Sequence, residues 1–497
     1  MNWEWLINET TLARLLPDVY AHYRRPLQGA LTLFLEGLPA LRQKAIAIEQ
    51  ATLPATATVS ERLVALARSC PVLHKLGQTL ARDRNLSVEL RRYLQRLESL
   101  PPSIPLKAVE SVLTQELGPL DRLGVTLQPP ALAEASVAVV VPFSLTGAQA
   151  PLKGVFKVLK PGIEECLEEE LDLVEQVGSF LDQGCDDLRI PHLEYRESFE
   201  QVRDMLQYEV RLGEEQNNLT LARGFHKTDS RVQVPELFDF CTPRITAMER
   251  VFGQKVTDCC TDSRSGDRRM SRLIIETLIA RPIFSKAVQA PFHGDPHAGN
   301  LFSTRDRRLA ILDWSLVGSL GEHERLLIMQ IMLGAMALHA ERILTGLSKL
   351  SKRQSSDLPA LRSIVYKWIG RIRNGHLPGF TWLTGLLDDA VSNAGLRFGA
   401  DLMLFRKALH MVEGVVTDMG AENGLIDQVL LSEFVLHFCA EWPWRFLRPP
   451  DSRAFATRVS TADLAELVLS LPWRAIGFWL DQNQALLNFG RCRTCSV

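Results

Sequence analysis

The stretch FHGDPHAGNLF, residues 292–302, and the run LAILDW, residues 309–314, decide how the whole chain is interpreted. Two apolar runs flank a polar turn at 303–308, so the pattern predicts a loop followed by a short β-hairpin. Asp295 and Asn300 lie on the predicted loop, and Asp313 ends the hairpin. Three oxygen-bearing side chains are therefore expected in one region.

Phosphoryl transfer requires side chains of this kind, because a carboxylate orients the attacking hydroxyl and oxygen ligands hold Mg²⁺ against the phosphates. Asp295 and Asn300 have the D-x-x-x-x-N spacing of a kinase catalytic loop, and Asp313 occupies the place of the next metal-binding Asp. Either pattern alone is more often a chance match or a turn former. Together with His293, they predict Asp295 as the catalytic carboxylate and Asn300 and Asp313 as metal ligands.

The same stretch resembles a known family. H-G-D-P-H-A-G-N is similar to the H-x-D-P-H-P-G-N signature of the UbiB/AarF/ADCK atypical kinases, and I-L-D-W-S-L-V-G is similar to their L-D-F-G-x-V-G. The resemblance implies an α+β, protein-kinase-like two-lobe fold with helical extensions at both ends. It also implies binding of ATP and Mg²⁺ and, in many members, support of isoprenoid quinone or lipid metabolism at a membrane.

The region before the hairpin contains further family motifs. K-L-G-Q, residues 75–78, resembles the family's K-x-G-Q motif, with Lys75 and Gln78 at its ends. A-E-A-S, residues 133–136, resembles the alanine-rich loop that covers the nucleotide where a typical kinase has glycines. The resemblance implies that this loop binds the cofactor through Ala133, Ala135 and Ser136. A turn of small residues between strands is the alternative for the loop alone.

Lys157 lies in the apolar run VFKVLKPG and matches the strand lysine that contacts the α and β phosphates. A lysine in a half-buried strand can also extend to the surface without a role. DMLQYEVRLGEEQNNL, residues 204–219, is similar to the family's E-L-D-F-x-x-E-A-x-N. If Asn218 matches the final Asn, Glu215 is the glutamate that pairs with Lys157, and both belong to the catalytic set.

The same alignment makes Glu209 the first acid of the family's E-x-D and puts Arg211 in place of its Asp. In the family that Asp faces the K-x-G-Q segment. With Arg211 opposite Lys75, like charges repel unless Glu209 or Glu98 intervenes. We therefore assign Lys75, Gln78, Glu209 and Arg211 a regulatory role and expect the helical extension to be held loosely.

Residues 248–251 match the family's hinge, whose backbone meets adenine. Thr242, Pro243 and Arg244 lead into it, as in T-P-R-V-L-V-M-E. The resemblance implies that Glu249 and Val251 bind the cofactor.

Composition bounds the function classes. The chain has 497 residues, of which 46% are hydrophobic and 23% charged, with 56 basic and 58 acidic side chains. A net charge of -2 disfavours nucleic acid as a partner. Nine scattered cysteines indicate reduced thiols, with the lone C-x-x-C at 492–495 read as a tail. The N-terminus lacks a basic stretch before an apolar run, so we expect a cytoplasmic protein.

The pattern of helices and strands predicts four parts. These are an N-terminal helical extension with K-x-G-Q (1–118), a kinase-like N-lobe (119–250), a C-lobe with the catalytic loop (251–420) and a C-terminal helical extension (421–497). Ser60 is the expected N-cap of one helix. The acidic run 165–181 is predicted to be a solvated helix face. The apolar window 326–340 is too short for a membrane span and predicts a buried helix.

Aromatic residues concentrate near arginines at the C-terminal end, and they are Trp442, Trp444, Phe446, Trp473, Phe478 and Trp479. An interfacial, peripheral membrane contact would use such residues. Packing between helices explains them equally well, and we favour packing.

The resulting hypothesis is an atypical kinase or ATPase of the UbiB/AarF type that acts on a small-molecule or lipid-like acceptor. Two alternatives stay open, namely a phosphotransferase for a metabolite or natural product and a non-catalytic ATP-binding regulator.

Overall fold

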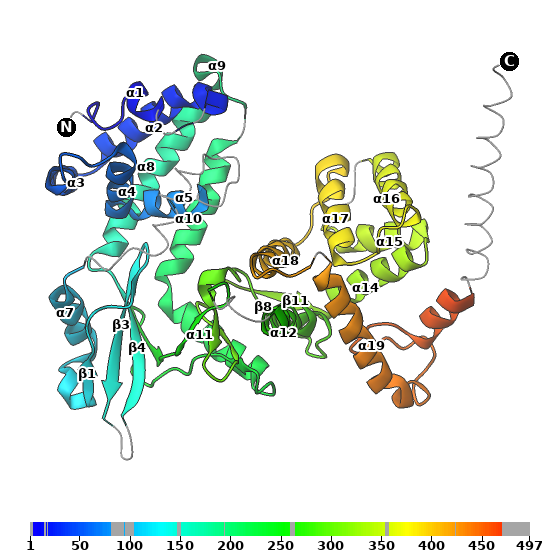
Figure 1. Cartoon of the computed structure of the whole chain (residues 1–497). Helices are drawn as coiled ribbons and strands as arrows, with labels where there is room; N and C mark the ends of the chain where they lie inside the picture. Colours follow the sequence, from blue (N-terminus) through cyan, green and yellow to red (C-terminus); the bar gives the residue numbers. More distant parts are fainter. Residues whose placement is uncertain are drawn as a thin grey trace. The chain divides into compact units, whose positions relative to one another are not determined.

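The computed structural model describes residues 3–13, 16, 18–80, 94, 104–146, 151–192, 194–258, 264–352, 357–422 and 424–469 (Figure 1). The chain divides into two compact units, Met1–Thr220 with Pro235–Arg250, and Leu221–Val234 with Val251–Val497. Helices predominate and the described strands form three sheets. The predicted α+β class is confirmed, and the boundaries predicted at 118, 250 and 420 stay predictions.

The first unit contains an antiparallel sheet in the order β1-β3-β4-β6, with β2 paired to β3. Its strands are β1 Val125–Leu127, β2 Ala133–Glu134, β3 Ala138–Leu145, β4 Leu152–Leu159 and β6 Ile245–Glu249. Phe143 of β3 and Phe156 of β4 stack at 4.2 Å in its core, where valines of helix α7 also pack. Gly154 lies opposite Phe143, whose ring occupies the space that a Cβ atom would need.

Helices form the rest of the first unit. They are α1 Glu9–Ala13, α2 Arg24–Gly37, α3 Ala40–Thr52, α4 Val59–Ser69, α5 Pro71–Leu80, α7 Leu106–Leu117, α8 Ile163–Gln183, α9 Cys185–Leu188 and α10 Tyr195–Val210, with short 3-10 turns at Asp18–Tyr23 and Leu120–Leu123. Helix α11, Leu212–His226, begins in this unit. Helix α8 lies beside α2, α5 and α10, and the apolar faces of these helices share one core (Figure 1).

One local prediction for these helices is wrong, and a second is correct only in part. Thr58, not Ser60, caps α4, because Thr58 and Glu61 form a reciprocal capping box and Ser60 is already inside the helix. In the acidic helix α8 the outer glutamates are exposed as predicted, but Glu170 is fully buried. Its carboxylate contacts Arg42 and accepts the Val72 N–H at 2.9 Å, so it caps the start of α5. Burial raises the pKa of Glu170 to about 7.

The second unit contains two sheets. One has the order β5-β10-β9-β7, with β5 Val232–Gln233, β10 Leu309–Ile311, β9 Leu301–Thr304 and β7 Gly253–Lys255. The other pairs β8 Gln289–His293 with β11 Val317–Gly321 in antiparallel register. Strands β9 and β10 are antiparallel neighbours, which confirms the predicted hairpin.

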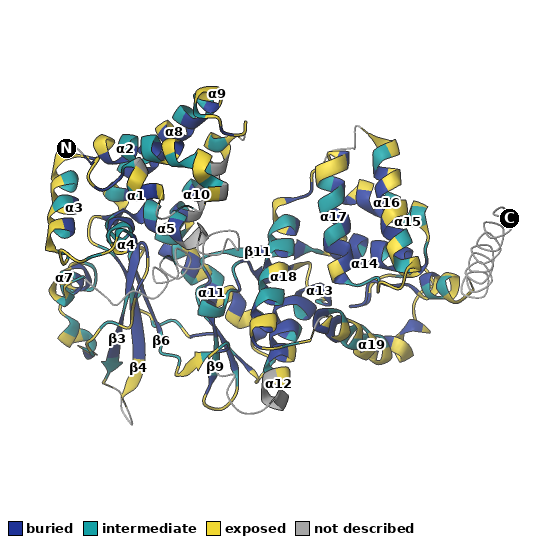
Figure 2. Cartoon of the chain, turned by 45° about the horizontal axis from the view of Figure 1, so that its top comes forward, coloured by how far each residue is buried: buried dark blue, intermediate teal, exposed yellow. Residues whose placement is uncertain are grey.

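The helices of the second unit are α12 Arg264–Ile275, a π-helical turn Glu276–Ala280, α13 Arg281–Ile283, a 3-10 turn Ala298–Asn300, α14 Glu322–Met336, α15 Ala340–Leu350, α16 Leu358–Arg373, α17 Phe380–Ala394, α18 Ala400–Asp418 and α19 Leu425–Arg445. Helix α14 covers most of the window 326–340, and most of its apolar residues are buried, Met336 at its end being exposed (Figure 2). The buried helix predicted there is confirmed.

Helix α19 differs from the prediction for the C-terminal aromatics. Trp442, Trp444 and Phe446 are 50%, 64% and 73% exposed, so packing between helices does not account for them. Leu431 and Leu436 of the same helix are also exposed, and Figure 2 shows this surface in yellow. The more distal aromatics and the C-x-x-C tail lie outside the described residues. Within the described residues, no helix has both the length and the apolar character of a membrane span.

Candidate active site

In the first unit, the structure brings Lys157 and Glu215 together. Lys157 lies on the central strand β4, opposite Val140 of β3 on one side and Thr246 of β6 on the other. Its ammonium donates to both carboxylate oxygens of Glu215, at 2.7 and 2.9 Å. Glu215 lies in the first turn of α11 and is 2% exposed. A buried charge of this kind is stable only when it is paired and hydrogen-bonded, so the contact holds α11 against the sheet.

The alanine-rich loop adjoins this pair in the sheet. Ala133 belongs to β2, which pairs with β3, and the Ala135 N–H donates to the Ala138 carbonyl at 2.8 Å. Ala133 and Ala135 are exposed, whereas Ser136 is buried. The loop is therefore a tight turn with small side chains on its outer surface.

The K-x-G-Q helix α5 is tied to that loop through Glu209 of α10. One oxygen of Glu209 contacts the Lys75 ammonium, and the other accepts the Ser136 hydroxyl at 2.7 Å. Arg211 instead lies 3.4 Å from Glu214 and is close to the Tyr208 ring. Each of the two cations thus has its own carboxylate partner, Glu209 for Lys75 and Glu214 for Arg211.

These two pairs replace the like-charge contact that we expected, and the loosely held extension itself stays a prediction. The side chain of Gln78 and the whole of Glu98 lie outside the described residues.

The hinge residues lie at the end of the sheet. Met248 and Glu249 end β6, where the Glu249 N–H donates to the Glu236 carbonyl at 2.7 Å. Val251 follows directly and is half-buried.

In the second unit, the catalytic-loop stretch follows β8. His293 is buried, accepts the Asp295 N–H through Nδ1 at 3.1 Å and contacts the Leu312 carbonyl through Nε2 at 3.0 Å. Burial lowers the pKa of His293, in keeping with a neutral ring that accepts at one nitrogen and donates at the other. The Asn300 amide nitrogen donates to the Asp295 carbonyl at 3.1 Å. These bonds fold residues 293–300 into a fixed loop.

Asp313 follows β10 with a positive φ of 53°, which non-glycine residues rarely adopt. Its carboxylate accepts the Ser315 N–H at 3.3 Å. Backbone strain of this type is often found at functional sites. The next residue, Trp314, packs edge-on against His293 at 4.8 Å.

Sequence reasoning missed one residue of this loop's surroundings. The ammonium of Lys407, on α18, lies 3.9 Å from Oδ1 of Asp295, while Nε2 of His297 lies 3.8 Å from Oδ2. Lys407 belongs to no local motif, since only the tertiary packing of α18 brings it to the loop.

The side chains present suit Mg²⁺. An Asn amide and an Asp carboxylate are the oxygen ligands that this ion prefers, and it usually takes few protein ligands beside phosphate oxygens. Since the Asn300 nitrogen is held by the backbone, its oxygen is the end left for a metal. In the described ranges, no group of three or more His, Cys, Asp or Glu side chains forms a full metal cage.

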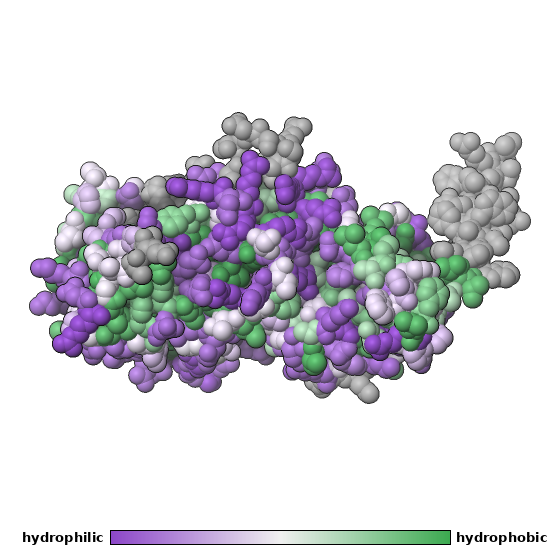
Figure 3. All heavy atoms as spheres, turned by 90° about the horizontal axis from the view of Figure 1, so that it is seen from below, coloured by the Kyte–Doolittle hydropathy of each residue, from purple (hydrophilic) through white to green (hydrophobic). Residues whose placement is uncertain are grey.

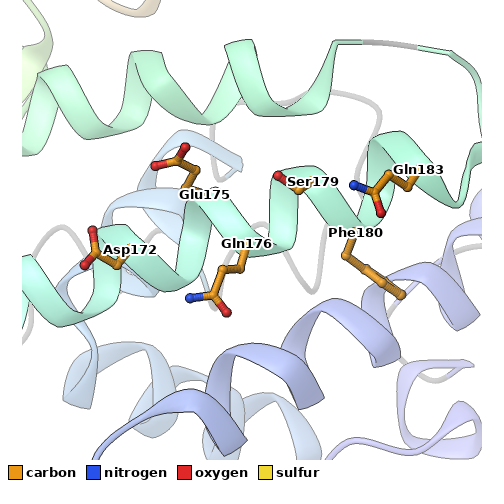
Figure 4. Close-up of a pocket in the computed structure, with 6 residues that line it drawn as sticks. All are labelled: Asp172, Glu175, Gln176, Ser179, Phe180 and Gln183. Carbon is orange, nitrogen blue, oxygen red and sulfur yellow. The ribbon is translucent and has the colours of Figure 1, made fainter.

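A cavity of about 590 Å³ lies apart from these residues, along α8. It is lined by Asp172, Glu175, Gln176, Ser179, Phe180 and Gln183 (Figure 4). None of the predicted site residues borders it.

Comparisons with known proteins identify the family of the chain. A family model described as the ABC1 atypical kinase-like domain matches residues 96–346. An aarF domain-containing protein kinase of Arabidopsis thaliana, named as chloroplastic, is 28% identical over 49% of this chain and 45% of its own length. A probable protein kinase UbiB of Haemophilus ducreyi is 29% identical over 53% of this chain and 49% of its own length.

The chain thus spans about half the length of the curated relatives it matches. A solved erythromycin complex from Mycobacterium tuberculosis aligns with a TM-score of 0.47 and 17% identity, over 70% of this chain and 86% of that one.

Proposed function

The chain belongs to the ABC1 atypical kinase-like family, the UbiB/AarF/ADCK group, with its kinase-like α+β fold, and from this premise we propose that it catalyses Mg²⁺-dependent phosphoryl transfer from ATP or hydrolysis of ATP. The observation that carries the proposal is the buried contact between Lys157 and Glu215. A strand lysine held by a helix glutamate is the arrangement with which kinases bind the phosphates of ATP.

Residues of the first unit would bind the nucleotide. Lys157 would contact the α and β phosphates, and Glu215 would hold its ammonium in place. The loop containing Ala133, Ala135 and Ser136 would cover the nucleotide, and the backbone at Glu249 and Val251 would meet adenine. The small side chains of the loop support close approach of a ligand to the backbone.

Residues of the second unit would carry out the chemistry. Asp295 would orient the acceptor hydroxyl and accept its proton as the new P–O bond forms and ADP leaves. Asn300 and Asp313 would hold Mg²⁺, which neutralises charge on the phosphates when it is bound. His293 would act on the loop's shape alone, since both its ring nitrogens contact the backbone.

A calorimetric titration of ATP with and without Mg²⁺ tests the proposal. We expect saturable, Mg²⁺-dependent binding to the wild-type protein and loss of that binding in Lys157→Met. Lys153→Met, which removes an exposed lysine from the same strand, is the matched control and should bind as the wild type does. No binding to the wild-type protein would contradict the proposal.

The acceptor belongs to the proposal as well. We propose a small-molecule or lipid-like acceptor, linked to isoprenoid quinone or lipid metabolism. A metabolite phosphotransferase and a non-catalytic regulator remain the alternatives. A regulator would bind ATP without turnover, and a metabolite kinase would change the phosphorylated metabolites of a deletion strain and leave its quinones intact.

We also propose a cytoplasmic location with peripheral contact to a membrane, and the exposed aromatic residues of helix α19 support the membrane contact. Trp442, Trp444, Phe446 and Leu447 are exposed together. Figure 3 shows apolar patches, in green, between hydrophilic areas of one face of the molecule. Trp and Phe side chains on such a surface suit the interface of a bilayer. Replacing Trp444 and Phe446 by Ser should reduce sedimentation with phospholipid vesicles, whereas Leu377→Ser, an exposed control elsewhere, should not.

A further inference from the structure

Helix α18 packs directly on the strands that carry the catalytic loop. The Phe405 ring meets the Phe292 ring of β8 edge-on, with centroids 5.1 Å apart. At the start of the helix, the Asp401 carboxylate accepts the Ser319 N–H of β11 at 3.3 Å. The helix lies beyond residue 346, where the family match ends. A segment outside the matched domain therefore forms part of the loop's surroundings.

Gly294, the residue before Asp295, shows how close this packing is. A Cβ atom there would lie 2.8 Å from Leu316 Cγ, 3.0 Å from the Leu316 carbonyl oxygen and 3.0 Å from Leu404 Cδ2. Leu404 is one of the α18 residues, so the helix occupies the space that a larger side chain at 294 would need. Helix α18 thus lies directly against the loop at the residue before Asp295.

Leu404 precedes Lys407 by three residues, so the two side chains lie on the same face of α18. The Lys407 ammonium is 3.9 Å from Oδ1 of Asp295, and its side chain is 44% exposed. The other oxygen, Oδ2, faces Nε2 of His297 at 3.8 Å. His297 accepts the Gly299 N–H through Nδ1, so the hydrogen of its neutral ring is on Nε2. A positive charge and an N–H donor therefore flank the two carboxylate oxygens.

We propose that Lys407 is a positioning residue of phosphoryl transfer that acts through the carboxylate of Asp295. The transferred phosphoryl group is negatively charged and must approach the hydroxyl held by the Asp295 carboxylate. The phosphoryl group and the carboxylate therefore repel each other. A cation beside the carboxylate reduces this repulsion in the transition state without exchanging a proton. Such contacts are often long in free enzymes and shorten in the reacting complex.

This inference rests on the proposed function, and a double-mutant cycle tests it. The readout is steady-state ATP turnover by the full chain. We expect Lys407→Met to lower kcat at least about tenfold, the scale of losing one preorganised charge partner, with KM for ATP within about twofold. Lys407→Arg, which keeps the charge, should restore most of kcat. Lys349→Met, an exposed lysine on α15, is the matched control and should be unchanged.

The cycle separates the role of Lys407 from a general loss of structure. In an Asp295→Asn background, Lys407→Met should change kcat less than about twofold, because the group it acts through is gone. Additive effects in the two backgrounds, or equal loss in Lys407→Met and Lys407→Arg, would overturn the assignment. So would an unchanged kcat in Lys407→Met. Absence of turnover in the wild-type protein would instead contradict the proposed function itself, and the role of Lys407 with it.

Discussion

Asp313 is the residue on which binding of the metal depends most in the proposed site. Asn tolerates the left-handed backbone that Asp313 adopts, so Asp313→Asn removes a charge and leaves the turn intact. We expect Mg²⁺-dependent ATP binding to weaken by about 1–3 kcal/mol, the scale of one charged ligand. Calorimetry measures this directly. Asp306→Asn, in the same hairpin and 59% exposed, is the control. Equal affinities for wild type and Asp313→Asn would show that the metal is held elsewhere.

His226 is expected to make the second unit sensitive to acid. Its ring is buried and packs at 6.1 Å from Trp314, and desolvation, followed by the charge of Arg281, lowers its pKa to about 3. The unfolded chain, with a pKa near 6.5, binds this proton first as the pH falls. Stability contributed by the neutral ring is therefore full above about pH 6.5 and is lost between pH 6.5 and 3.

The loss amounts to about 1.4 kcal/mol for each pH unit. Urea unfolding followed from pH 7 to 5 measures it. His226→Phe should flatten the dependence, whereas His323→Gln, an exposed histidine of the same unit, should not. Parallel curves for wild type and His226→Phe would contradict this origin of the acid sensitivity.

At the scale of elements, Glu209 connects helix α5 to the alanine-rich loop through Lys75 and Ser136. Glu209→Gln removes the charge that holds Lys75. Hydrogen exchange of the α5 amides 72–77 should then rise about tenfold, which corresponds to about 1.4 kcal/mol of lost local stability. Arg211→Asp is the informative control. The Arg211 side chain contacts Glu214, so hydrogen exchange in α5 should stay the same in this variant. A decrease would support repulsion between Arg211 and Lys75.

Local patterns predicted the elements that depend on neighbouring residues. The β9–β10 hairpin follows from two apolar runs around a polar turn, and the buried α14 follows from its apolar composition. Local patterns gave wrong predictions where tertiary packing determines whether a side chain is buried. Glu170 lies in an acidic run, yet it is buried because its carboxylate contacts Arg42 and the first turn of α5. Trp444 belongs to an aromatic cluster, yet no described helix covers it.

The candidate site shows the same division. Lys157, Glu215 and Asp295 were predicted because each matches a motif of the family that the sequence resembles, and their roles stay predictions. Lys407 could not be predicted, because a residue far along the chain reaches the loop only when α18 packs on β8. The interaction of Glu209 with both Lys75 and Ser136 could likewise not be predicted, because it depends on how α5 and α10 pack.

For the molecule as a whole, we propose that this member of the ABC1 family transfers phosphoryl groups. Binding of ATP alone would also be expected of a non-catalytic regulator. Measuring turnover therefore distinguishes an enzyme from a regulator. The hydrogen bonds that His293 and Asn300 make to Asp295, the predicted catalytic carboxylate, use the N–H and the carbonyl of its backbone. Replacing its side chain by an amide therefore leaves the loop's bonds in place.

The most direct measurement is single-turnover transfer or hydrolysis of the γ-phosphate of labelled ATP by the wild-type protein and by Asp295→Asn. We predict Mg²⁺-dependent turnover by the wild type. In Asp295→Asn the rate should fall about 10²-fold or more, with ATP affinity nearly unchanged, because the carboxylate acts in the transition state. Equal rates for the two proteins, or no turnover by a wild-type protein that binds Mg²⁺ and ATP, would contradict the account.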